Sequence, residues 1–193
     1  MKIILLGGKA NSGKDTAAEF IDEYYRSRGL DVVNIQIASY LKMYAKNIAK
    51  WDGDNETKPR QLLQDLGTEL IRKQIDQYFF IKRIIQDIDI YSRYFDVITI
   101  SDGRLPEEFA SIKLAYPETV TVHVTRPGFE SRLTKDQKAH VTESLVDTIE
   151  YDLDIVNDGT IDDLQKQCIE LVQTIEKNTN FERHVVKRPI IKE

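Results

Sequence analysis

The sequence predicts an α/β fold, with a five-stranded parallel sheet covered by helices on both faces. Short apolar runs alternate with longer segments of helical period along the 193-residue chain. This alternation is typical of a parallel sheet, because each parallel strand reaches the next through a crossover helix. The runs expected to form strands are residues 2–6, 32–37, 96–100, 119–124 and 153–156. In such sheets ligands bind where the carboxyl ends of the strands meet, so the polar loops that follow them are the candidate site.

The segment between the first strand and the first helix has the spacing of a phosphate-binding loop. Gly8 and Gly13 flank four residues, and Lys14 follows directly. Such a loop points its backbone N–H groups at phosphate oxygens, and the helix expected over about 14–28 adds the positive end of its dipole. The loop therefore predicts binding of a nucleoside triphosphate. The residues expected to bind ATP here are Gly8, Ala10, Asn11, Ser12, Gly13, Lys14, Asp15 and Thr16.

The loop departs from the strict pattern at the residue after the lysine. This position usually carries Ser or Thr as a Mg²⁺ ligand, but here it is Asp15, with Thr16 one place later. A carboxylate is a good hard-oxygen ligand, so Asp15 is expected to hold Mg²⁺ directly or through water, while Thr16 bonds a phosphate oxygen. A plain glycine turn is the alternative, but it does not explain why strand, loop, lysine and helix coincide.

A second acidic signal follows the apolar run 96–100, which closes on Ser101 and Asp102. A carboxylate beside the phosphate loop orients Mg²⁺ through its waters or accepts a hydrogen bond from the acceptor substrate. The alternative is an acid that only begins a turn before Gly103. Arg104 follows within the same turn.

The helical region of about 38–94 contains a segment with two distinct faces. Over residues 59–75, at the α-helical 100° per residue, the leucines gather on one side, and Arg60, Gln64, Gly67 and Thr68 lie on the other. A glycine inside a helix costs about 1 kcal/mol relative to alanine, so Gly67 needs a reason. From periodicity alone, close approach of a ligand and a solvated face with a packing glycine remain equal alternatives.

A lid of about 126–148 is expected after the fourth strand, because the segment 128–142 is charged throughout and lacks an apolar stripe. Arg126, beside Pro127 at the strand end, is expected to neutralise the transferred phosphate. Arg132 has the same expected role, with surface charge as its alternative. After the last strand, Asn157 is either a contact to the base of ATP or part of an ordinary strand-to-helix turn.

Composition narrows the classes of partner. The net charge of −5 argues against a nucleic-acid binder with a broad basic surface, although a local cationic pocket is compatible with it. No apolar run approaches membrane-spanning length, and Cys168 is expected to be a reduced, buried core residue. We therefore expect a cytoplasmic protein with one domain over 1–177, whose partners are small-molecule nucleotides rather than nucleic acid or membrane. The tail 178–193 is an added strand, a homodimer contact or a loose end.

Four blocks, residues 8–21, 59–69, 100–108 and 124–143, together resemble the phage-type deoxynucleoside monophosphate kinases of the P-loop nucleotide kinase superfamily. The resemblance implies a three-layer α/β/α P-loop kinase fold with a helical lid. It also implies that Arg60, Gln64 and Gly67 border the acceptor nucleotide, and that Asp102 and Arg104 face its phosphate and the metal. The Gly-Lys-Asp-Thr ending of the loop is distinctive but shared with some phosphomevalonate kinases. Dephospho-coenzyme A kinases usually carry Ser in place of Asp15, which weighs against them.

The resulting hypothesis is phosphoryl transfer from ATP to a (deoxy)nucleoside monophosphate, with Mg²⁺ near Asp15, Thr16 and Asp102. The residues expected to be catalytic are Lys14, Asp102, Arg126 and Arg132. The alternatives are a dephospho-coenzyme A or phosphomevalonate-type kinase on the same scaffold, and a nucleotide-binding module that transfers nothing. An NTPase acting on nucleic acid is disfavoured by the acidic balance.

Overall fold

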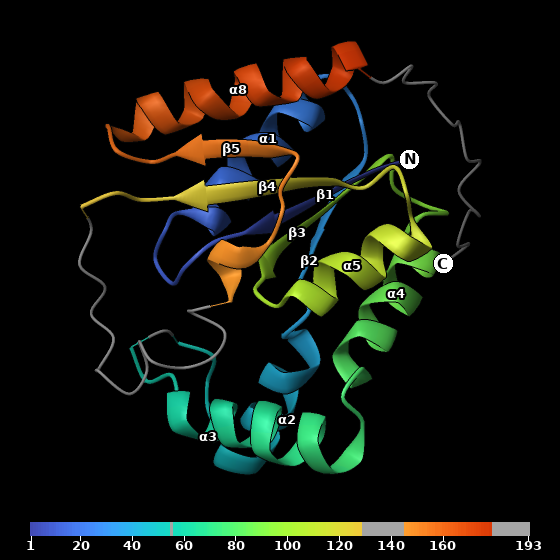
Figure 1. The fold of residues 1–193 in the computed structure, drawn as a ribbon, viewed down its shortest axis with the longest axis vertical. Helices are drawn as coiled ribbons and strands as arrows, with labels where there is room; N and C mark the ends of the chain where they lie inside the picture. Colours follow the sequence, from blue (N-terminus) through green and yellow to red (C-terminus); the bar gives the residue numbers. More distant parts are fainter. Residues whose placement is uncertain (55, 129–144, 179–193) are drawn as a thin grey trace, which may run out of the picture.

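The computed structural model describes residues 1–54, 56–128 and 145–178 of the chain (Figure 1). Its centre is a parallel sheet of five strands in the order β2-β3-β1-β4-β5. The strands are β1 (Lys2–Gly7), β2 (Val32–Ile35), β3 (Val97–Gly103), β4 (Val120–Thr125) and β5 (Leu153–Val156). The helices are α1 (Lys14–Ser27), α2 (Ser39–Ala49), α3 (Arg60–Gln64), the π-helix η1 (Asp65–Ile75), α4 (Phe79–Tyr91), α5 (Pro106–Ala115), the 3-10 turn η2 (Val146–Thr148) and α8 (Ile161–Asn178).

The two faces of the sheet carry separate cores, because side chains alternate along a strand. In β1, Ile4 and Leu6 pack toward α1 and α8, and Ile3 and Leu5 pack toward α4 and α5. All four are fully buried, as a strand covered on both faces requires. Cys168 of α8 belongs to the first core and is a free, buried thiol, as expected.

The helices form three groups around this sheet (Figure 1). Helices α1 and α8 lie together on one side, and α4 and α5 lie on the other. Helices α2 and α3 form a group apart from the sheet and pack on each other. The chain leaves β1 for β2 on one side and later reaches β4 on the other, so the carboxyl end of β1 is the switch point where ligands bind in such sheets.

Every expected strand is present, with shifts at the ends. The second strand stops at Ile35 rather than continuing to Ile37. The third extends to Gly103, so Ser101 and Asp102 belong to the strand instead of to a turn that follows it. The first helix ends at Ser27. The prediction of a five-stranded parallel sheet with helices on both faces is confirmed.

The expected single α-helix over 59–75 is instead a short α-helix followed by a π-helix, which begins at Asp65. A π-helix bonds i to i+5 and has more residues per turn than an α-helix, so a projection at 100° per residue drifts out of register. Leu70, placed on the apolar face by that projection, is 41% exposed. Leu63, placed beside it, lines a pocket together with Arg60.

Candidate active site

The loop after β1 has a backbone that requires its two glycines. Gly8 and Gly13 have φ values of +147° and +102°, a region that L side chains rarely adopt. A Cβ on Gly8 would lie 2.2 Å from the carbonyl oxygen of Val124, and one on Gly13 would lie 2.6 Å from Nδ2 of Asn157. Both positions therefore need glycine for space as well as for conformation.

Lys14 is folded back into this loop. Its side chain is buried, and its Nζ donates to the carbonyl oxygen of Lys9 at 2.6 Å and lies 3.5 Å from Oγ of Ser12. Helix α1 starts at Lys14, and its N-cap, Gly13, supplies no side-chain capping bond. The first N–H groups of a helix have no partner within the helix, so this start presents donors and a positive dipole end to an anion.

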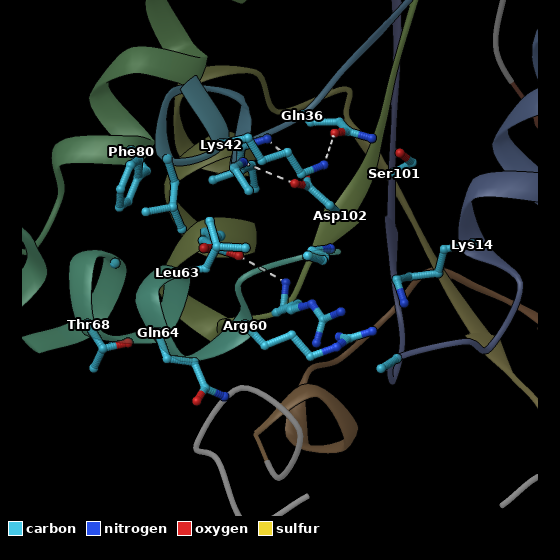
Figure 2. A pocket seen from close by; sticks show the side chains of 18 of the residues that line it. Lys14, Gln36, Lys42, Arg60, Leu63, Gln64, Thr68, Phe80, Ser101 and Asp102 are labelled. Atoms are coloured by element: carbon cyan, nitrogen blue, oxygen red, sulfur yellow. Dashed lines mark hydrogen bonds between the residues drawn. The ribbon is translucent and has the colours of Figure 1, made fainter. Parts of the chain in front are cut away.

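A pocket of about 440 Å³ extends from this loop toward α2, α3 and η1 (Figure 2). Figure 2 shows Lys14 at one end and Phe80 and Thr68 at the opposite end, with Arg60 between them. The apolar part of the wall includes Leu63 and Phe80. The full lining is Ala10, Asn11, Lys14, Asp15, Gln36, Ile37, Ala38, Leu41, Lys42, Lys58, Arg60, Leu63, Gln64, Gly67, Thr68, Arg72, Phe80, Ser101, Asp102, Arg104 and Glu108.

The charge of this pocket is opposite in sign to that of the chain. Among the described residues that line it, the cationic ones are Lys14, Lys42, Lys58, Arg60, Arg72 and Arg104, and the acidic ones are Asp15, Asp102 and Glu108. Two of the acids are already engaged within the protein: Asp102 with backbone N–H groups and Glu108 with Arg72. The pocket is therefore suited to an anionic ligand even though the chain carries a net charge of −5.

Asp102 holds the turn between β2 and α2. Its two carboxylate oxygens accept hydrogen bonds from the backbone N–H groups of Ile37 at 2.8 Å and Ala38 at 3.0 Å (Figure 2). Each carboxylate oxygen can accept a further hydrogen bond, and Asp102 lines the pocket. Asp102 therefore shapes the wall of the site, and its expected role toward acceptor and metal stays a prediction.

Arg72 and Glu108 form an ion pair in the wall of the pocket. Nη2 of Arg72 lies 3.1 Å from Oε1 of Glu108, and the other carboxylate oxygen accepts from the backbone N–H groups of Arg104 at 2.9 Å and Leu105 at 3.1 Å. Burial raises the pKa of the Glu108 carboxyl, and the Arg72 guanidinium opposes that shift. The guanidinium also stacks on Phe80, with its Cζ 4.9 Å from the ring centre.

The structure brings most of the predicted site residues to one pocket. Those that line it are Ala10, Asn11, Lys14, Asp15, Arg60, Gln64, Gly67, Asp102 and Arg104. Gly8, Ser12, Gly13 and Thr16 belong to the loop and the first turn of α1, outside this wall. Arg126 lies exposed just after β4. Arg132 and the central part of the expected lid lie outside the described residues.

The structure gives Asn157 and Gly67 structural roles, whereas the sequence alone did not decide between a structural role and contact with a ligand. The Asn157 amide donates to the carbonyl oxygen of Ser12 at 3.0 Å and thereby braces the phosphate loop. A Cβ on Gly67 would lie 3.0 Å from Cδ2 of Leu41, so this glycine admits the close packing of α2 against η1. Contact of either residue with a nucleotide stays a prediction.

Several lining residues were missed by the sequence analysis. Lys42 and Gln36, which are hydrogen-bonded to each other, follow the carboxyl end of β2. That position is a general signal for a ligand site, and it could have identified them. Lys58 stands two places before Arg60, in the loop that precedes α3, where no sequence motif marks it. Arg72 had no local signal, because its partner Glu108 is distant in sequence.

The oxygen groups at the start of α1 fit a hard cation. Asp15 lines the pocket beside Lys14, and the Thr16 hydroxyl follows in the same helical turn. Carboxylate and hydroxyl oxygens, with phosphate oxygens of a nucleotide, are the ligands that Mg²⁺ takes in proteins. Within residues 1–54, 56–128 and 145–178 no group of three or more His, Cys, Asp or Glu side chains is arranged to hold a metal.

None of the helices in these ranges has the length and apolarity to cross a bilayer.

Comparisons with known proteins agree with this arrangement. The deoxynucleotide monophosphate kinase of Enterobacteria phage T4 is 32% identical over 112 residues, which cover 58% of this chain and 44% of that protein. The enzyme of the same description from Escherichia phage RB69 is 30% identical over 115 residues, covering 59% of this chain and 44% of that protein. The match therefore spans under half the length of these relatives.

A solved structure supports the fold. The APS kinase of Mycobacterium tuberculosis superposes with a TM-score of 0.53 over 89% of this chain and 96% of that chain, at 12% sequence identity. At this identity the likeness concerns the three-layer P-loop kinase fold alone, which confirms the fold class expected from the sequence.

The family follows from a match over most of the chain. The family model described as deoxynucleotide monophosphate kinase matches residues 26–168. The matched range begins after the phosphate loop, which is identified by its own geometry. The chain therefore belongs to the deoxynucleotide monophosphate kinase family.

Proposed function

We propose that this chain transfers the γ-phosphoryl group of ATP to the phosphate of a deoxynucleoside monophosphate, producing a diphosphate. The observation that carries the proposal is the single pocket that begins at the phosphate loop, passes through a cationic middle and ends in an apolar wall. A nucleoside monophosphate has the matching order of parts: a phosphate that faces the donor and a flat base beyond it. The names of the phage relatives support the deoxy form of the acceptor.

The residues divide into a donor side and an acceptor side. Lys14 and the loop N–H groups hold the β- and γ-phosphates of ATP, which the positive start of α1 also favours. Arg60 and Arg104 bind the acceptor phosphate, and Leu63 and Phe80 cover its base. Arg126, and Arg132 in the lid, neutralise the transferred group.

Such a transfer requires positioning and charge neutralisation rather than covalent help from the protein. The oxygen of the acceptor phosphate is already anionic near neutral pH, so no general base is needed to create the nucleophile. The transition state spreads negative charge over the equatorial oxygens, which the cations of the pocket stabilise. Asp15 and Thr16, with Asp102 nearby, would hold Mg²⁺, which would supply positive charge to neutralise the donor phosphates.

A panel of acceptors in a coupled ADP-release assay tests the proposal. The panel contains the four deoxynucleoside monophosphates, the four ribonucleoside monophosphates, dephospho-coenzyme A and phosphomevalonate, each with ATP and Mg²⁺. We expect acceptor-dependent ADP release with at least one deoxynucleoside monophosphate and none with the last two compounds. Tight ATP binding without any acceptor-dependent release would instead indicate a nucleotide-binding module.

The Lys14→Ala variant assigns the activity to this loop. Loss of the buried Nζ removes the charge that faces the phosphates, so we expect turnover to fall by about 10³-fold or more. Lys166→Ala, on the exposed face of α8, is the control for loss of one positive charge. Circular dichroism and melting curves check that both variants fold. Near-normal turnover by folded Lys14→Ala would refute the assignment of the donor site.

A further inference from the structure

Lys58 is a cationic residue of the pocket to which neither the sequence motifs nor the proposed donor site assigns a role. It is half-buried, lies just before α3, and lines the pocket with Arg60 and Arg104. The charges that act on it are mostly of its own sign, from Lys42, Arg60 and Arg104, and Asp15 is the acid that acts against them. In the part of the chain that the structure describes, its ammonium makes no hydrogen bond or ion pair.

This arrangement is electrostatically unfavourable without a ligand. Burial lowers the pKa of the Lys58 ammonium, and the neighbouring cations Lys42, Arg60 and Arg104 lower it further, in that order of effect. Half-buried like charges repel because water screens them only partly. An anion bound among these cations would attract each of them and so offset their mutual repulsion.

The backbone of Lys58 is fixed independently of its side chain. Asp52 accepts bonds from the Asp54 N–H at 2.9 Å and the Thr57 hydroxyl at 3.0 Å, and the Trp51 indole N–H donates to the Asp54 carbonyl at 2.9 Å. Pro59 follows with φ of −78°, near its fixed value. These hydrogen bonds and Pro59 fix the shape of the loop. The Lys58 side chain is therefore not needed to hold the loop and is available to bind a ligand in the pocket.

We propose that Lys58 is a binding residue for the acceptor phosphate and makes the pocket select a phosphate monoester over the uncharged nucleoside. The inference rests on the proposed function and adds a residue to its acceptor side. The phosphate monoester is a dianion at pH above about 6, so it supplies charge to more than one of the surrounding cations. Lys58 gains from this ligand the partner that the described protein does not provide.

Steady-state kinetics of Lys58→Gln and Lys58→Arg, with Lys166→Gln as the matched loss of a lysine, test the proposal. The acceptor is whichever deoxynucleoside monophosphate the wild-type chain uses best. In Lys58→Gln we expect the acceptor KM to rise about 10- to 100-fold, the range for loss of a charge-assisted hydrogen bond, with the KM for ATP within about threefold of wild type. Lys58→Arg keeps the charge and is expected to restore most of the loss.

A pH profile separates a charge role from a packing role. A lysine with a lowered pKa loses its proton at a lower pH than its ordinary value of 10.5. The wild-type kcat/KM for the acceptor should therefore decrease on the alkaline side, since this ratio reports groups of the free enzyme. In Lys58→Arg this alkaline decrease should move beyond the measured range, because arginine stays charged.

The outcomes distinguish failure of the proposed function from failure of the role proposed for Lys58. If no monophosphate supports ADP release by the wild-type chain, the proposed function fails and this inference fails with it. If the wild type turns over a monophosphate but Lys58→Gln changes the acceptor KM no more than Lys166→Gln does, the inference alone is overturned. Failure of Lys58→Arg to restore the KM, with the alkaline decrease unchanged, would overturn it as well.

Discussion

The Gly8→Ala substitution tests how tightly the phosphate loop is built into the sheet. A Cβ at this position would lie 2.2 Å from the carbonyl oxygen of Val124 and 2.9 Å from Oγ of Ser12. Val124 is in β4, which is paired with β1 on one side and β5 on the other. Its carbonyl cannot withdraw without disturbing two ladders, so the loop has to move instead.

The expected cost has two parts. Backbone strain at φ of +147° costs about 1–3 kcal/mol for a residue with a Cβ. Inserting one methyl group against an unyielding neighbour adds about 1–3 kcal/mol. The free energy of unfolding should therefore fall by about 2–6 kcal/mol, which for a chain of this length lowers the Tm by roughly 6–18 °C.

Gly128→Ala is the matched control, because it isolates the strain. Gly128 also has positive φ, +72°, but among the described residues no atom beyond its chain neighbours lies within 4 Å of its Cβ position. We expect its Tm to fall by only about 2–4 °C, from about 1 kcal/mol of strain. Melting curves of both variants, with and without ATP and Mg²⁺, give the comparison. Equal melting temperatures for the two variants, or full stabilisation of Gly8→Ala by ATP, would refute the description of the loop as packed against β4.

Two further predictions concern Asn157 and Asp22. In Asn157→Ala the loop loses its hydrogen bond to Ser12, so the KM should rise by about five- to tenfold for ATP and GTP alike, whereas a rise that differs between ATP and GTP would show contact with the base instead. Asp22 is buried and accepts from the Thr99 hydroxyl at 2.8 Å, and burial raises the pKa of its carboxyl. Because its pKa is higher in the folded than in the unfolded protein, Asp22 makes its full contribution to stability below the unfolded pKa of 3.8, and this contribution is lost as the pH rises through the folded pKa. The Tm of Asp22→Asn should therefore increase relative to that of wild type between pH 4 and 8. A difference that stays constant across that range would contradict the buried-carboxyl argument.

The sheet could be predicted from the sequence because its signals are local. The strands are short runs rich in apolar and β-branched residues, of which Ile3 to Leu6 is continuously apolar, and a polar or glycine residue follows each run. The phosphate loop could be predicted for the same reason, since its glycines and lysine are fixed by spacing along the chain. The register of β1 with β3 and β4 then brings the loop and Asp102 to one edge.

The acceptor side was harder to predict because its helix has an uncommon period. An α-helical projection placed Gln64, Gly67 and Thr68 on one side, and these residues line the pocket, but it also placed Leu70 on the apolar face, whereas Leu70 is 41% exposed in the π-helix. Arg72 is held at the pocket by its ion pair with Glu108, which no sequence pattern within η1 predicts. Long-range ion pairs of this kind depend on the packing of η1 against α5 and its loop, which spacing along the chain does not encode.

The charge balance of the pocket connects the fold to the proposed acceptor. Its cations come from the start of α1, from α2, from the segment before α3, from α3 and η1, and from the loop after β3, and the packing of α2, α3 and η1 beside the sheet edge brings them together. Of its three acids, Glu108 is paired with Arg72, and Asp102 is bonded to the backbone of the β2–α2 turn. Asp15 is then left as the acid facing Lys58 and its cationic neighbours. Binding of a phosphate anion is thus expected to stabilise the pocket as well as to position the acceptor, and both effects should weaken as ionic strength rises.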